Sequence, residues 1–154
     1  MLHRPSFKTF LTTIAICTFL LSSYSQVWAD ELDEVKPLVL RKIMRDIGKS
    51  MQNVTDGISR EDWDMVGTAA QLIADHPEPP LLEKMRVLRF VGVDAANFKE
   101  LDERTHKEAR ALMQAALRSD GQAAISSFAS LQNSCLACHQ SFRKPFVEHF
   151  YGQR

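Results

Sequence analysis

The chain has 154 residues, of which 45% are hydrophobic and 25% charged, with 19 basic and 19 acidic side chains. This length favours a single domain, and this composition argues against a disordered chain, a collagen-like repeat and a membrane protein with many spans. The formal net charge of zero offers no electrostatic case for nucleic acid binding, so we expect no nucleic acid partner.

Residues 1–29 have the pattern of a secretory signal peptide. A basic start with Arg4 and Lys8 is followed by an apolar stretch over residues 9–21 and then by small residues before the acidic sequence that begins at Asp30. We predict that this segment is removed by cleavage before Asp30.

Cleavage would leave residues 30–154 as a single domain in the periplasm, with no stable membrane insertion. The alternative is an uncleaved membrane anchor, but the apolar stretch is shorter than the roughly 20 residues that a spanning helix needs. Cleavage also removes Cys17, so the mature chain keeps only Cys135 and Cys138.

The mature chain has a helical pattern throughout, because apolar residues recur at spacings of three and four and no stretch alternates as a strand would. We predict amphipathic helices over about 33–55, 60–75, 94–118 and 120–149. Their short connections favour an all-α fold, an antiparallel four-helix bundle with up-down-up-down topology. Prolines end the second helix, and the connection over 76–93 is expected to hold one or two helical turns closed by Gly92.

Several single residues have predicted places in this bundle. Ser59 is expected to cap the second helix, because a serine before a helix accepts from the free N–H groups of its first turn. His106 lies among charged residues and is expected to be exposed. Most of the methionines are expected to fill the core: Met51, Met65, Met85 and Met113.

The sequence Cys135-Leu136-Ala137-Cys138-His139 matches C-x-x-C-H, the attachment motif for haem c. On a helix, positions i, i+3 and i+4 share one face. Both thiols can therefore add to the vinyl groups of one haem, and His139 can coordinate its iron. We predict one covalent haem c, held through thioethers by Cys135 and Cys138, with His139 as an axial ligand.

Other interpretations of the two cysteines are weaker. A redox pair of the thioredoxin type belongs at a strand-to-helix junction, and no strand is expected here. A zinc site needs further ligands at suitable spacing, and His106 and His149 are isolated in the sequence. A disulfide between positions three apart on a helix would be strained.

Met44 is the predicted axial ligand on the other side of the iron. His139 lies about three helical turns before the end of the last helix, and the matching depth on the antiparallel first helix is Met44. The same depth match brings residues 73–76 and 98–102 to the level of the haem. Core packing is the alternative role for Met44. The iron would then have no sixth protein ligand, or a different one such as His76.

These features resemble the class II c-type cytochromes, the cytochrome c′ family. The export signal, the four amphipathic helices and a single motif near the C-terminus agree with that family, and CLACHQSFRKPF resembles its attachment helix, including Phe142-Arg143 after the histidine. High-spin members leave the iron five-coordinate, whereas a low-spin subgroup has a methionine on the first helix. The sequence around Met44 is more similar to the low-spin subgroup.

The expected function is electron transfer rather than catalysis, since no acid or base can be placed beside the haem from the sequence. A methionine ligand favours ferrous iron. Transient redox partner proteins would dock near the haem edge, and the candidate contacts for them are Arg41, Lys42, Arg143 and Lys144. The alternative, which the resemblance to high-spin members implies, is a five-coordinate protein that binds NO or CO. The resemblance also allows a homodimer.

Overall fold

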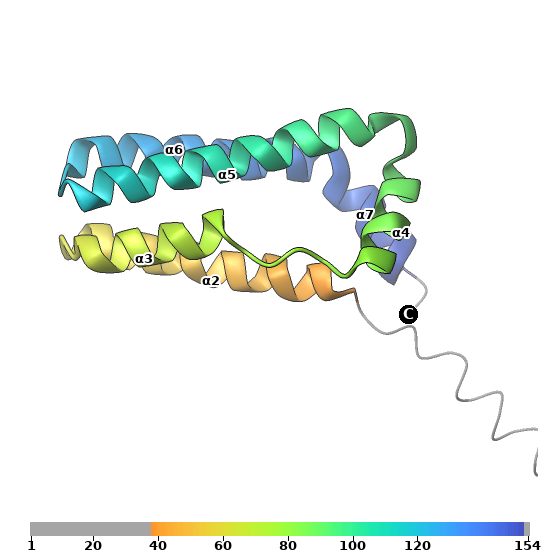
Figure 1. Cartoon of the computed structure of the whole chain (residues 1–154), viewed down its shortest axis with the longest axis horizontal. Coiled ribbons are helices and arrows are strands. Elements are labelled where there is room, and N and C mark those ends of the chain that lie inside the picture. The colour runs from red at the N-terminus through yellow and green to blue at the C-terminus, as the bar shows by residue number, and fades with distance from the viewer. Residues whose placement is uncertain (1–37, 153–154) are drawn as a thin grey trace, which may run out of the picture. The chain divides into compact units, whose positions relative to one another are not determined.

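The structure, a computed structural model, describes residues 38–152 (Figure 1). The bundle is formed by α2 (Val39–Ser59), α3 (Trp63–Ala74), α5 (Ala95–Leu117) and α6 (Gly121–Cys138). These helices run alternately up and down, each antiparallel to the next (Figure 1). The described residues contain no strand, which confirms the predicted all-α, antiparallel four-helix bundle. The predicted signal peptide, residues 1–29, lies outside the described residues, as does the proposed cleavage site before Asp30.

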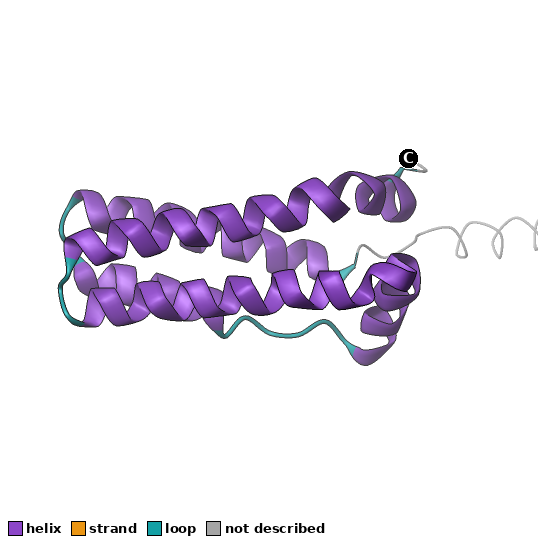
Figure 2. Ribbon diagram, turned by 90° about the horizontal axis from the view of Figure 1, so that it is seen from above, coloured by secondary structure: helices purple, strands orange, loops and turns teal. Residues whose placement is uncertain are grey.

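Two shorter helices lie at the end of the bundle where α2 begins (Figures 1 and 2). One is α4 (Leu81–Val91), which is longer than the one or two turns predicted for this connection. It ends at Gly92, as predicted, where a φ of 55° suits a residue without a side chain. The other is α7 (Lys144–Tyr151), which continues α6 after the π-helical turn His139–Arg143. No helix in the described part of the chain is both long and apolar enough to cross a membrane.

The boundary between α2 and α3 differs from the prediction. Ser59 does not cap α3; it is the last residue of α2, and its hydroxyl donates to the Thr55 carbonyl oxygen at 2.8 Å. The capping residue is Asp62, whose carboxylate accepts a hydrogen bond of 3.0 Å from the Met65 N–H. At the other end, α2 begins at Val39, directly after Leu38 with its non-helical ψ of 142°. The predicted start near residue 33 lies outside the described residues.

The start of α2 is held by α4 and α7. The Glu83 carboxylate on α4 accepts hydrogen bonds from the Leu40 N–H at 2.7 Å and the Val39 N–H at 2.8 Å. A carboxylate in this position satisfies free N–H groups and opposes the positive end of the helix dipole. The contact with α7 is made by Arg41, whose guanidinium lies over the Tyr151 ring, 5.4 Å from its centroid. These contacts place the beginning of α2 beside the C-terminal helix.

The core is concentrated in one half of the bundle. Its cluster of fully buried side chains comes from the second halves of α2 and α5, from α3 and from the first part of α6, and it includes Val54, Val66, Ile73, Leu112 and Leu131. A close approach of α2 and α3 makes this packing possible. A Cβ at Gly57 would lie only 2.8 Å from the Val66 Cγ2 atom. The half of the bundle next to α4 and α7 contributes few fully buried side chains.

Candidate haem attachment site

The two cysteines and the histidine of the attachment motif lie where α6 ends. Cys135 and Cys138 belong to its last turn, which is regular α-helix, and His139 is the first residue of the π-helical turn. Both thiols are free and partly buried. A spacing of three residues on an α-helix places both thiols on one face, and His139 follows directly, as the haem c prediction requires.

The π-helical turn His139–Arg143 was not expected, since one continuous helix was predicted over 120–149. Pro145, in the first turn of α7, explains it. A proline lacks the N–H that would bond to the carbonyl of Ser141 four residues earlier, and its ring clashes with that carbonyl in an α-helix. Pro145 was thus the sequence signal for the interruption. The wider turn separates His139 from the straight part of the helix, and π-helical turns frequently lie at functional sites.

The N-terminal half of α5 runs beside the motif. The Thr105 hydroxyl lies 3.1 Å from the hydroxyl of Ser134, the residue before Cys135. Nearer to the start of α5, the Phe98 ring meets the Phe142 ring edge-on, with centroids 5.2 Å apart. These contacts confirm that residues 98–102 lie at the level of the attachment residues.

The side chains around the motif suit an apolar macrocycle. On α5, Ala109 and Leu112 are fully buried. Phe98 and Leu101, which are nearer to the start of this helix and to the motif, are only partly buried. Cys135 and Cys138 are partly buried as well. An apolar surface beside two thiols and an imidazole is the donor set and environment that a covalent haem requires. The residues present therefore fit the predicted cofactor.

Burial shifts the pKa of all three motif residues. Burial raises the pKa of the Cys135 thiol and, helped by the negative charge of Asp102, that of the Cys138 thiol. Burial and, secondarily, the positive charge of Arg143 lower the pKa of His139. A lower pKa favours the neutral form of the His139 imidazole, which is the form with a lone pair available for iron.

Met44 lies on α2 at the edge of the buried face. The buried residues of α2 are Ile43, Ser50, Val54 and Gly57, and Met44 is not among them. Met44 itself is 42% exposed. Met44 lies about one helical turn after Arg41, whose guanidinium lies over the Tyr151 ring of α7.

The four basic residues predicted to flank the haem are all exposed: Arg41, Lys42, Arg143 and Lys144. Two of them form ion pairs within their own helix. The Lys42 ammonium lies 2.6 Å from the Asp46 carboxylate, and the Lys144 ammonium lies 4.0 Å from the Glu148 carboxylate. All four side chains remain accessible to a partner.

Two further predictions about single residues are wrong. His106 is only 21% exposed in its side chain, because its ring stacks on His76 with centroids 4.8 Å apart and bonds to the Ala74 carbonyl. The stacking of His76 on His106 joins separate elements, so no local sequence pattern predicts it. Met85 does not fill the core and is 51% exposed. It lies on a face of α4 that is open to solvent, together with Leu81, Leu82 and Leu88.

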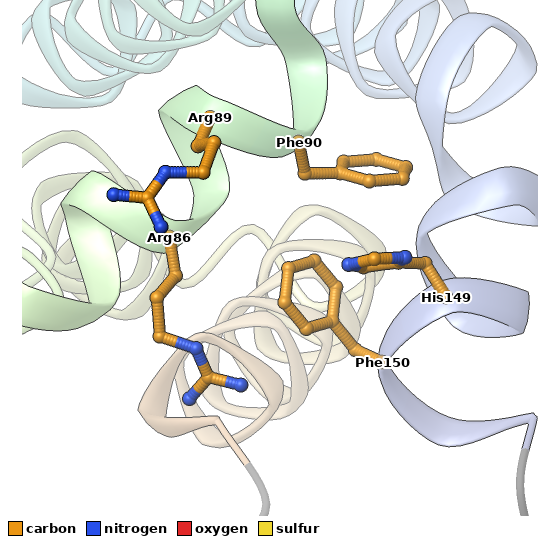
Figure 3. A pocket seen from close by; sticks show the side chains of 5 residues that line it. All are labelled: Arg86, Arg89, Phe90, His149 and Phe150. Atoms are coloured by element: carbon orange, nitrogen blue, oxygen red, sulfur yellow. The ribbon is translucent and has the colours of Figure 1, made fainter.

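A pocket lies between α4 and α7 (Figure 3). The Phe90 ring stacks on the His149 ring with centroids 4.8 Å apart, and Phe150 meets both rings at steep angles. The side chains of Arg86 and Arg89 complete the lining. His149 thus helps to join α7 to α4.

Comparison with known proteins identifies the family. Residues 40–143 match the family described as Cytochrome C′, a range that runs from the first turn of α2 through the π-helical turn and includes Met44, Cys135, Cys138 and His139. No curated protein and no solved structure matches the chain. Because the match covers more than half of the sequence, the chain belongs to the cytochrome c′ family, and this membership implies a c-type haem.

Proposed function

We propose that the protein is an exported electron carrier with one covalent haem c and no enzymatic activity of its own. The observation that supports this most is the placement of Cys135, Cys138 and His139 at the junction of α6 and its π-helical turn, beside a partly buried face of α5. When bound, the haem supplies one-electron chemistry. The N-terminal sequence pattern supports a periplasmic location.

In this proposal, Cys135 and Cys138 would hold the haem through thioethers, and the His139 imidazole would coordinate its iron. The thioether of Met44 would be the second ligand. Its exposure of 42% supports this role, because its thioether is not committed to core packing. The contact between Arg41 and Tyr151 supports it as well, since it brings the first turn of α2 to the helix that continues the motif.

Transient redox partners would dock near the exposed cations Arg41, Lys42, Arg143 and Lys144. Charges at the rim of an interface steer encounter and orientation more than they add affinity. A partner with an acidic surface fits this group.

A second candidate function follows from the family match. The cytochrome c′ family includes five-coordinate proteins, and such an iron, with no ligand from Met44, would bind NO or CO. The two candidates share Cys135, Cys138 and His139 and differ only in the role of Met44.

An optical spectrum of the purified holoprotein distinguishes them. Met44 ligation gives a low-spin ferrous spectrum and a ferric far-red band from sulfur-to-iron charge transfer, and Met44→Ala should convert this spectrum to high-spin. Met51→Ala is the matched control, because Met51 lies on the same helix about two turns deeper and its replacement should leave the low-spin spectrum intact. A high-spin spectrum of the unaltered protein would reject Met44 as a ligand and favour the gas-binding candidate.

A further inference from the structure

Two histidines and an aspartate meet where α3 ends beside α5. Asp102 and His106 are one turn apart on α5, and His76 lies in the connection after α3. One ligand atom of each side chain lies within 4.8 Å of the others. His106 is mostly buried, and the Asp102 side chain is half exposed, so the cluster is both held in place and open to solvent.

Hydrogen bonds of the two Nδ1 atoms select the tautomer of each neutral imidazole. The His106 Nδ1 atom lies 2.6 Å from the Ala74 carbonyl oxygen, and the His76 Nδ1 atom lies 3.1 Å from the Pro77 carbonyl oxygen. A carbonyl oxygen only accepts, so Nδ1 is the donor in each ring. The lone pair of each neutral ring is therefore on Nε2. Histidines that bind metals have this arrangement, in which a backbone carbonyl orients the ring.

The lone pair of His106 faces a carboxylate. Its Nε2 atom lies 3.5 Å from an Asp102 carboxylate oxygen. Two acceptors in this position repel each other unless a proton or a cation lies between them. A positive charge between His106 and Asp102 would therefore relieve this repulsion.

We propose that His76, Asp102 and His106 bind a divalent transition-metal ion of the Zn²⁺ type at a site separate from the haem iron. Two imidazole nitrogens and one carboxylate oxygen are a common ligand set for such ions, with water completing the coordination. Ligand atoms on a tetrahedral zinc lie about 3.3 Å apart at bond lengths of about 2.0 Å. His76 has to turn out of its stack on His106 to reach this spacing, and its place in a connection between helices permits the movement.

Calorimetric titration of the untagged holoprotein with Zn²⁺ tests the site. We expect one Zn²⁺ per chain, and a loss of affinity of at least about tenfold in each of His76→Gln, Asp102→Asn and His106→Gln. His149→Gln is the matched control, because His149 is an exposed histidine on α7 and its replacement should leave the affinity unchanged. An unchanged haem spectrum shows that each variant is folded and that Zn²⁺ does not reach the iron.

The alternative is a protonated His106 paired with Asp102 and no metal. Failure of the unaltered protein to bind Zn²⁺ would support that pair and overturn the site. Equal loss of affinity in His149→Gln, or unchanged affinity in both His76→Gln and Asp102→Asn, would overturn it too. His76 and Asp102 are outside the core, so their replacement tests the site even where His106→Gln disturbs the Ala74 contact.

Discussion

The Thr105 hydroxyl lies 3.1 Å from the Ser134 hydroxyl and joins α5 to α6 directly before the attachment motif. Ser134 is fully buried and donates its only hydroxyl proton to the Leu131 carbonyl oxygen at 2.7 Å, so its oxygen accepts from Thr105. The Thr105 proton is shared with the Leu101 carbonyl oxygen at 3.0 Å. This contact holds the partly buried part of α5 against the helix that carries the cysteines.

Replacing Thr105 with valine should lower the free energy of unfolding by about 1 kcal/mol, since the shape is kept and one shared, partly buried hydroxyl proton loses its acceptors. Urea unfolding of the holoprotein measures the change. Thr68→Val is the control, because Thr68 is exposed on α3 and surface substitutions usually change stability by less than about 0.5 kcal/mol. Equal stability of the Thr105 variant and the unaltered protein would contradict the role of this bond.

Two glycines of α2 should respond oppositely to alanine. A Cβ at Gly48 meets no heavy atom within 4 Å, so Gly48→Ala should stabilise the protein by about 1 kcal/mol through helix propensity. A Cβ at Gly57 lies 2.8 Å from the fully buried Val66 side chain and 3.1 Å from the Asp62 carbonyl oxygen. Gly57→Ala should therefore destabilise it by about 1–3 kcal/mol. Urea unfolding of both variants checks the pair, and a stabilising effect at Gly57 would show that α2 and α3 do not approach as closely as described.

The sequence predicted most reliably what depends on neighbours along the chain. The helices follow from apolar spacing, and the placement of both cysteines on one face follows from the three-residue spacing of Cys135 and Cys138. The depth match along antiparallel helices also held for residues 98–102, because Thr105 and Phe98 reach Ser134 and Phe142.

What the sequence missed depends on contacts between elements. Ser59 and Asp62 both suit a helix cap, and only the actual end of α2 distinguishes them. The buried residues of α2 are Ile43, Ser50, Val54 and Gly57, so Met44 lies beside the buried face and not on it. The stacking of His76 on His106 requires a register between α5 and an irregular connection, which no local pattern encodes.

Intact mass spectrometry in denaturing acid should find a chain that begins at Asp30 and carries the full mass of one haem. The full mass is expected because a thiol adds across a vinyl group without loss of atoms. Variants that replace both Cys135 and Cys138 with alanine should lose this mass, since acid removes haem that is not covalently attached. A chain that begins at Met1 would contradict cleavage, and a haem-free mass of the unaltered protein would contradict covalent attachment.

The pKa of Glu78 should lie below its ordinary value, because the Lys84 ammonium bonds to its carboxylate at 2.5 Å. A carboxyl with a lower pKa in the folded state stabilises the fold above its unfolded pKa, and this contribution disappears as the pH falls through the folded pKa. Lys84→Gln should therefore raise the pKa of Glu78 and should matter little for stability at acid pH. An NMR titration of the Glu78 carboxyl measures the shift. Lys99→Gln, which removes an exposed lysine paired with Glu103, is the control and should leave the Glu78 titration unchanged.

Zinc should raise the reduction potential of the haem if both the metal site and the haem lie where we propose. Asp102 is near enough to raise the pKa of Cys138, so a cation bound by Asp102 and His106 would lie close to the attached haem. Added positive charge disfavours the ferric state more than the ferrous state. Redox titration with and without Zn²⁺ should show an upward shift in the unaltered protein and none in His106→Gln. Zinc that binds by calorimetry but leaves the potential unchanged would contradict this proximity and would leave the metal site itself standing.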